Sequence, residues 1–335
     1  MSESCAQIEV SNLSKTYRVP VRTEGISAAL KSLAKRRYDD VVAVRDVDFA
    51  VRTGEIVGLI GPNGAGKTTT LKILTGLLHP TCGQVRVAGF VPWERSHEYL
   101  RQVSMVFGNK SQMLWDIPPL DSFRVLGEIY RVPAATYRQT LDELIALLDM
   151  QELLGKPVRN LSLGERMKCE LVAGLLYRPQ VMFLDEPTLG LDVSMQLRLR
   201  RFLAEYNAQR GVTILLTSHY MADVLALCSR VILIHHGRLL YDGELGKLAK
   251  QMAPFKLLRV TLDSENGSEE QTSRTLEGLK MPVEKDGNTL TLRVERAEAP
   301  AITARLLQTL PVADLSVEDP PIDAVIDQVY QEGAP

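Results

Sequence analysis

Short apolar runs alternate with stretches of helical spacing through most of the chain. The runs are bounded by turn residues, which is typical of buried strands. We assign strands to Ile56 to Ile60, Val103 to Phe107, Val181 to Leu184, Thr213 to Leu216 and Val231 to Ile234. Helical patterns lie between them at residues 70–78, 122–148, 151–177 and 221–228, the third with a break at 160–164. This alternation predicts an α/β fold with a parallel core sheet.

The N-terminal region has strand periodicity. Ile8 to Val10 and Tyr17 to Val19 are expected to be short edge strands around a turn at Ser11 to Lys15. Val41 to Ala50 and the segment between Gly83 and Gly89 are expected to be further strands. These strands predict a second sheet beside the core.

Residues 23–40 interrupt the strands with helical spacing. Ile26, Leu30, Leu33 and Ala34 share one face, and the basic residues Lys31, Lys35, Arg36 and Arg37 lie elsewhere. We interpret the segment as an inserted basic amphipathic helix. It could lie near lipid headgroups or a membrane subunit, or be a solvated charged face packed on its own domain.

The composition changes after residue 246. Strand patterns at 256–263, 289–294 and 314–317 and helical patterns at 269–279 and 300–310 predict a small α+β unit. We therefore expect one domain at 1–246, with a helical subdomain at about 110–178, and an accessory or regulatory domain at 247–335.

The composition and charge of the chain limit the classes of function that it can have. The chain has 335 residues and a formal net charge of -2, so nothing in its overall charge calls for a nucleic-acid partner. Its four cysteines (Cys5, Cys82, Cys169 and Cys228) are far apart and predict free thiols in a reducing cytoplasm. No apolar run is long enough to span a bilayer and no signal peptide is evident. We expect any membrane role to come through a partner.

The first candidate site is the loop from Gly61 to Thr69, GPNGAGKTT, between an apolar strand and a helix. Its glycines allow a tight turn with inward N–H groups, Lys67 can reach the outer phosphates, and the Thr68 hydroxyl can bind Mg²⁺. The expected ligand is a nucleoside triphosphate; the alternative is a flexible glycine loop.

Polar residues follow two further strands. Asp185 ends an apolar run and can hold Mg²⁺, while Glu186 can deprotonate an attacking water. In isolation such a pair is often only a solvated strand end. His219 follows another strand and could reach a γ-phosphate, although a single histidine in this position is usually structural.

Five motifs that follow one another in the sequence reduce the number of protein families to which the chain could belong. They are GPNGAGKTT, LSLGE at Leu161 to Glu165, VMFLDEP at Val181 to Pro187, LGLD at Leu189 to Asp192 and TSH at Thr217 to His219. The set resembles the ATP-binding subunit of an ABC transporter over about Ile8 to Gly246. The C-terminal unit resembles, more weakly, the domain appended to ATPase subunits of exporters with separately encoded permeases.

The resemblance implies a P-loop ABC ATPase core with a mixed sheet, flanking helices, a helical subdomain and antiparallel edge strands, plus a small α+β domain. It implies a homodimer or pseudo-dimer that binds ATP and Mg²⁺ and works with transmembrane permeases. Glu186 and His219 would be catalytic, and Thr68 and Asp185 would hold Mg²⁺. The residues that would bind ATP are Tyr17, Gly61, Pro62, Asn63, Gly64, Ala65, Gly66, Lys67, Thr68 and Thr69.

Other implied residues act between subunits. Ser162, Leu163, Gly164 and Glu165 would contact the ATP of the second subunit, and Asp192 would link the two sites. Leu163 and Glu165 depart from the family's usual glycine and glutamine. The family also has a glutamine after the strand ending at Phe107. Here Asn109 is the closer positional match, and Gln112 could substitute if the loop is shifted.

These observations predict a cytoplasmic ATPase subunit, peripheral on the inner face of the membrane, that powers transport, with export favoured. The alternative is a soluble ABC-type ATPase in metal-cluster assembly or in nucleic-acid or ribosome-linked work. A P-loop kinase or a binding-only module would leave Ser162, Gly164 and His219 unexplained.

Overall fold

The structure is a computed structural model that describes residues 6–20, 38–108, 110–263 and 283–332. The chain divides into two compact units, Met1–Glu244 and Leu245–Pro335. Each unit has its own sheets, helices and buried apolar core. The two are described separately below.

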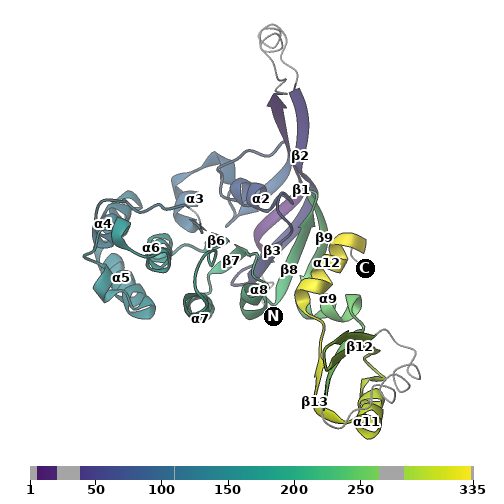
Figure 1. Ribbon diagram of the computed structural model, residues 1–335. Helices are drawn as coiled ribbons and strands as arrows, with labels where there is room; N and C mark the ends of the chain where they lie inside the picture. Colours follow the sequence, from purple (N-terminus) through teal and green to yellow (C-terminus); the bar gives the residue numbers. More distant parts are fainter. Residues whose placement is uncertain (1–5, 21–37, 109, 264–282, 333–335) are drawn as a thin grey trace, which may run out of the picture. The chain divides into compact units, whose positions relative to one another are not determined.

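A six-stranded sheet forms the centre of the first unit (Figure 1). Its order is β5 (Val103–Phe107), β6 (Val181–Asp185), β7 (Thr213–Thr217), β3 (Ile56–Ile60), β8 (Arg230–His235) and β9 (Arg238–Glu244). All neighbours are parallel except β8 and β9, which pair antiparallel. Because parallel strands end at the same edge, the residues after β3, β6 and β7 are brought together there.

A second, antiparallel sheet has the order β2 (Tyr38–Arg52), β1 (Ala6–Pro20) and β4 (Cys82–Val87). Helix α2 (Lys67–Leu74) joins the two sheets. Its Leu71, Ile73 and Leu74 are fully buried in one cluster with Ile8 and Val85 of the antiparallel sheet and apolar residues of the central sheet. The helix that follows the glycine-rich segment Gly61 to Thr69 is thus fixed by apolar packing on both sides.

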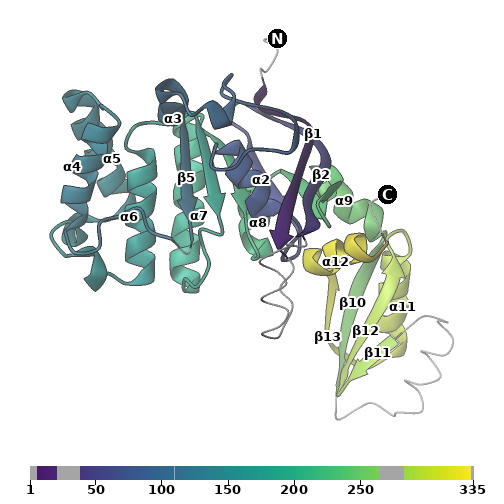
Figure 2. The same ribbon diagram turned by 90° about the horizontal axis from the view of Figure 1, so that it is seen from above.

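Six more helices of at least one and a half turns belong to this unit among the described residues. They are α3 (His97–Gln102), α4 (Pro119–Ile129), α5 (Ala134–Leu148), α6 (Leu163–Leu175), α7 (Val193–Arg210) and α8 (Met221–Leu227). Helices α4, α5 and α6 are grouped at one side of the central sheet (Figures 1 and 2). No helix in the described parts of the chain is long and apolar enough to cross a membrane.

The second unit is a four-stranded antiparallel sheet with helices. The strand order is β11 (Val283–Asp286), β12 (Thr289–Glu295), β10 (Phe255–Leu262) and β13 (Val312–Glu318). Helix α11 (Ala299–Thr309) buries Ala299 and Leu306 against the sheet residues Leu258, Val260 and Leu292. Helices α9 (Leu245–Met252) and α12 (Ile322–Glu332) are the other helices among the described residues of this unit.

The N-terminal prediction of two edge strands and a turn is wrong. Residues 6–20 form one strand that lies in the middle of its sheet. The polar residues between Val10 and Leu13 make a bulge, with Asn12 at φ 52°, and the register shifts there without reversing the chain. Bulges and turns use the same residue types, which explains the error.

Three other assignments need correction. Of the predicted inserted helix, residues 23–37 lie outside the described residues, and Tyr38 to Asp40 belong to β2 because they pair with β1. The helical pattern at 151–177 is broken into two 3-10 turns before α6 begins, since Pro157 cannot continue a helix. The prediction also lacked α12, although Val325, Ile326 and Val329 lie at helical spacing and are buried.

Candidate active site

The glycine-rich loop runs from β3 into α2. An added Cβ at Gly61 would lie 2.2 Å from the carbonyl oxygen of Ile234, and Gly66 has φ 109°. Neither position can take a side chain without moving the backbone, so the loop conformation depends on both glycines. Lys67 is buried, and its ammonium group donates hydrogen bonds to the carbonyl oxygens of Gly61 and Pro62.

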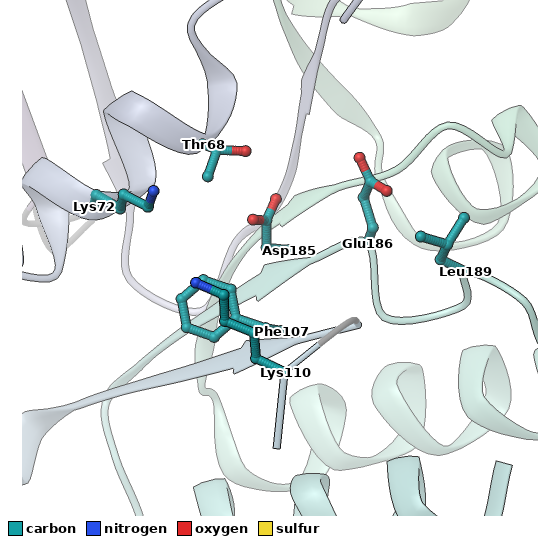
Figure 3. A pocket seen from close by; sticks show the side chains of 7 residues that line it. All are labelled: Thr68, Lys72, Phe107, Lys110, Asp185, Glu186 and Leu189. Atoms are coloured by element: carbon teal, nitrogen blue, oxygen red, sulfur yellow. The ribbon is translucent and has the colours of Figure 1, made fainter. Parts of the chain in front are cut away.

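Two acidic residues face this loop across the edge of the sheet. Burial lowers the pKa of the Lys67 amine, while the nearby Glu186 and Asp185 carboxylates act in the opposite direction. Thr68, Asp185 and Glu186 line one pocket of about 220 Å³, and Figure 3 shows the Thr68 hydroxyl and the two carboxylates around the same space. The Lys67 ammonium group and the carboxylates of Asp185 and Glu186 are therefore close enough to interact.

Neighbouring strands hold Asp185 and Glu186. Glu186 has φ 55°, an uncommon conformation for a residue with a side chain, and its N–H donates to the carbonyl oxygen of Thr217 at 3.1 Å. The Thr217 hydroxyl donates to Asp185 Oδ1 at 2.7 Å. His219 Nε2 lies 2.8 Å from Glu186 Oε1. The ends of β6 and β7 thus bring together an acidic pair and a histidine, as an acid–base site requires.

Ser162 lies at the N-terminus of α6. Its hydroxyl accepts a hydrogen bond from the N–H of Glu165, and its own N–H donates to Glu165 Oε2 at 2.7 Å, which is a capping box. The backbone hydrogen bond from Ser162 lowers the pKa of Glu165. None of the residues 162–165 lines the pocket around Thr68 and Glu186.

Comparisons with known proteins identify the family. A family model described as "ABC transporter" matches residues 44–189, and one described as "EvrA-like ABC transporter, C-terminal domain" matches residues 254–318. The chain is 33% identical over 217 residues to the ABC transporter ATP-binding protein NatA of Bacillus subtilis, covering 64% of this chain and 88% of NatA. The chain belongs to the family of ABC transporter ATP-binding proteins.

Another relative and two solved structures agree with this assignment. The Nod factor export ATP-binding protein I of Ralstonia nicotianae is 34% identical over 216 residues, covering 63% of this chain and 65% of that protein. A structure titled as the ATP binding subunit of an ABC transporter has a TM-score of 0.60 and 27% identity, covering 73% of this chain and 92% of that one. A dimeric cassette bound to ADP and Pi has a TM-score of 0.58 at 20% identity, covering 71% and 98%, and supports the fold. The predicted fold class and ATP hydrolase activity are confirmed.

The remaining predicted residues of this ABC ATPase lie apart from the pocket. Tyr17 is half-buried on β1, with the Lys15 ammonium 5.4 Å above its ring. Asp192 caps α7 by accepting a hydrogen bond from the N–H of Met195 at 2.9 Å, which lowers its pKa. The side chain of Leu163 lies next to Gly190 of the LGLD segment: a Cβ added to Gly190 would be 3.0 Å from Leu163 Cδ2. The role of each stays a prediction.

Sequence reasoning missed several residues of the site. Gly108 donates its N–H to the carbonyl oxygen of Asp185, and a Cβ there would lie 2.0 Å from the carbonyl oxygen of Glu186. Lys72 and Lys110 line the pocket. Thr217 could have been predicted from the sequence, because Thr217 ends the apolar strand that precedes His219. The close approach of Gly108 had no counterpart in the local sequence pattern.

Mutations can test which side-chain amide, that of Asn109 or that of Gln112, takes the place of the family's glutamine after β5. Asn109 lies outside the described residues, and Gln112 has an exposed side chain and a backbone N–H bonded to Glu170. We expect Asn109→Ala to lower kcat about tenfold, the loss of one hydrogen bond to the water, and Gln112→Ala to leave it near wild type. Steady-state ATPase assays of the two variants decide the matter. Wild-type rates in both would show that neither amide serves this role.

Proposed function

We propose that this ATP-binding subunit closes as a dimer on Mg²⁺-ATP, and that closing and reopening drive export by separate membrane permease subunits. One observation carries the proposal. Thr68 of the glycine-rich loop and the acidic pair line one pocket, and His219 lies 2.8 Å from Glu186, whereas Ser162 and Gly164 neither line the pocket nor contact these residues. A second copy could supply these missing groups.

The residues of the pocket suit Mg²⁺. Hard cations prefer oxygen ligands, and Thr68 and Asp185 present a hydroxyl and a carboxylate to the same space. Among the described residues, no group of three His, Cys, Asp or Glu side chains could hold a metal ion by itself. A cation here would take further ligands from phosphates and water, as Mg²⁺ commonly does. When bound, it would neutralise charge on the phosphates.

The chain's own residues then have separate tasks. Lys67 would exchange its two loop carbonyl partners for phosphate oxygens, which are stronger acceptors for an ammonium group. Glu186 would take a proton from the attacking water, and His219, 2.8 Å away, would hold the carboxylate in position. Thr217 orients Asp185 through its hydroxyl.

The helix that begins after Ser162 would complete the site of the partner. Its free N–H groups and the serine hydroxyl form an anion-binding end that the chain's own pocket does not use. Asp192 lies at the start of α7, and Met195 of that helix would be 3.0 Å from a Cβ on Gly164. The family resemblance implies that Asp192 links the two sites of the dimer, and the closeness of its helix to Gly164 supports that role.

Other features support the proposal that the protein has membrane partners and takes part in export. The loop before α4 exposes Leu114 and Trp115, each 49% accessible, and such a pair can anchor a protein interface. The C-terminal match is to a domain of ABC transporters, and one relative is named for Nod factor export. We infer a place in the cytoplasm, on the inner face of the membrane.

Purification from membranes tests this function. The tagged chain, extracted in mild detergent, should retain a membrane protein with several spans, identified by mass spectrometry. Trp115→Ala should lower that recovery several-fold, because interface anchors lose their contact when truncated. Arg124→Ala, a change at an exposed position of α4, is the matched control. Recovery of ribosomal or nucleic-acid proteins without a membrane protein would favour the soluble alternative.

A further inference from the structure

Glu170 on α6 is a buried carboxylate with no obvious place in the reaction. It is 4% exposed and lies about two turns after Ser162. Within the described parts of the chain, no lysine, arginine or histidine forms an ion pair with it. Burial raises its pKa, and hydrogen bonds from the loop at Ser111 and Gln112 oppose that rise. A buried acid of this kind needs a specific set of donors.

Those donors come from one loop. The Ser111 hydroxyl donates to Glu170 Oε1 at 2.5 Å, and the N–H of Gln112 lies 3.1 Å from both carboxylate oxygens. The Ser111 oxygen in turn accepts a hydrogen bond from the N–H of Met113 at 3.1 Å. Residues 111–113 are therefore gathered around a side chain of α6. If the loop left α6, the carboxylate would lose its partners.

A second contact fastens the same loop to the same helix. The Arg166 guanidinium, one turn before Glu170, lies 5.2 Å from the centre of the Trp115 ring. The carbonyl oxygen of Trp115 accepts a hydrogen bond from the N–H of Arg159, which precedes α6. Two contacts thus join the loop to α6: the hydrogen bonds to the Glu170 carboxylate and the cation–π contact between Arg166 and Trp115.

The other end of the loop reaches the phosphate pocket. Lys110, next to Ser111, lines the pocket with Thr68, Asp185 and Glu186 (Figure 3). Its ammonium group lies 5.4 Å from the centre of the Phe107 ring. No ion pair holds this ammonium group among the residues that the structure describes. It is a cation that can turn toward a phosphate.

We propose that Glu170 is a positioning residue that holds residues 111–113 on α6 and thereby places Lys110 against the phosphates of the nucleotide. The inference deepens the proposed function, because the N-terminus of α6 would meet the partner's nucleotide while Lys110 serves the chain's own. A movement of α6 on dimer closure then moves Lys110 as well.

Variants that separate positioning from folding test the idea. Glu170→Leu puts an apolar side chain of similar size in place of the acceptor, and the freed donors of Ser111 and Gln112 belong to exposed residues that water can reach, so we expect the melting temperature to change little. We expect kcat/KM for Mg²⁺-ATP to fall about tenfold in both Glu170→Leu and Lys110→Met, and no further in the double variant. Changes that remove the same contact do not add. Cys169→Ala and Lys156→Met are the matched controls and should keep wild-type kcat/KM.

Trp115 gives a readout that does not depend on catalysis. In a Trp93→Phe background it is the single tryptophan of the chain. Without nucleotide, acrylamide should quench its fluorescence more strongly in Glu170→Leu than in Cys169→Ala. Wild-type quenching in Glu170→Leu, or a roughly hundredfold loss in the double variant, would overturn the inference. A Glu186→Gln chain that stays monomeric with Mg²⁺-ATP would instead contradict the proposed dimer and leave this comparison valid.

Discussion

Replacing Glu186 by glutamine should lower ATP turnover by at least about 100-fold and leave ATP binding intact. A positioned general base contributes roughly 10²–10⁴-fold to a rate, and glutamine has nearly the same shape but cannot take a proton. The hydrogen-bond distance of 2.8 Å to His219 Nε2 can be kept by the amide oxygen. Steady-state ATPase assays and equilibrium binding of a fluorescent ATP analogue measure the two effects.

The same variant should accumulate as an ATP-bound dimer, because the dimer reopens only after hydrolysis. Light scattering with Mg²⁺-ATP should then give twice the mass of one chain. Adding Ser162→Asp should abolish that dimer: aspartate caps a helix as well as serine does, but its charge would face the partner's phosphates. Glu152→Gln, at an exposed position, is the control for Glu186→Gln. Unchanged turnover in Glu186→Gln would remove Glu186 from the role of base.

The grouping of polar residues at one edge of the central sheet could be predicted because these residues lie at the ends of strands. Asp185 and Glu186 follow one apolar run and Thr217 to His219 follow another, and parallel strands place such ends side by side. The glycine-rich loop from Gly61 to Thr69 could be predicted equally well, since its glycines and lysine lie in one short segment. For these parts, the order of polar residues along the chain already contains the geometry.

Contacts between distant segments could not be predicted in this way. Glu170 and Ser111 are 59 positions apart, and a glutamate in a helix gives no sign of burial. The approach of Gly108 to the backbone of Glu186 depends on the pairing of β5 with β6. The bulge at Asn12 depends on pairing too, because β1 has partners on both sides. Tertiary packing decides all three.

Asp223 is the clearest case of a contact between distant segments, and it joins the segments that follow β6 and β7. Its side chain is 1% exposed and accepts hydrogen bonds from the Thr188 hydroxyl, from Ser218 Oγ at 2.7 Å and from Arg200 Nε at 2.6 Å. Thr188 lies two residues after Glu186, and Ser218 immediately precedes His219. One carboxylate therefore ties the segment after Glu186, the segment before His219 and α7 together.

Asp223→Ala should lower the free energy of unfolding by about 3–5 kcal/mol, because it leaves the guanidinium of Arg200 buried without its partner. Urea unfolding followed by tryptophan fluorescence reports on the first unit, which contains Trp93 and Trp115. Asp121→Ala breaks an exposed ion pair with Arg124 and should cost at most about 1 kcal/mol. Adding Arg200→Met to Asp223→Ala should recover part of the loss, since no unpaired charge then remains. A loss in Asp223→Ala no larger than in Asp121→Ala would show that the buried pair does not hold the segments after β6 and β7.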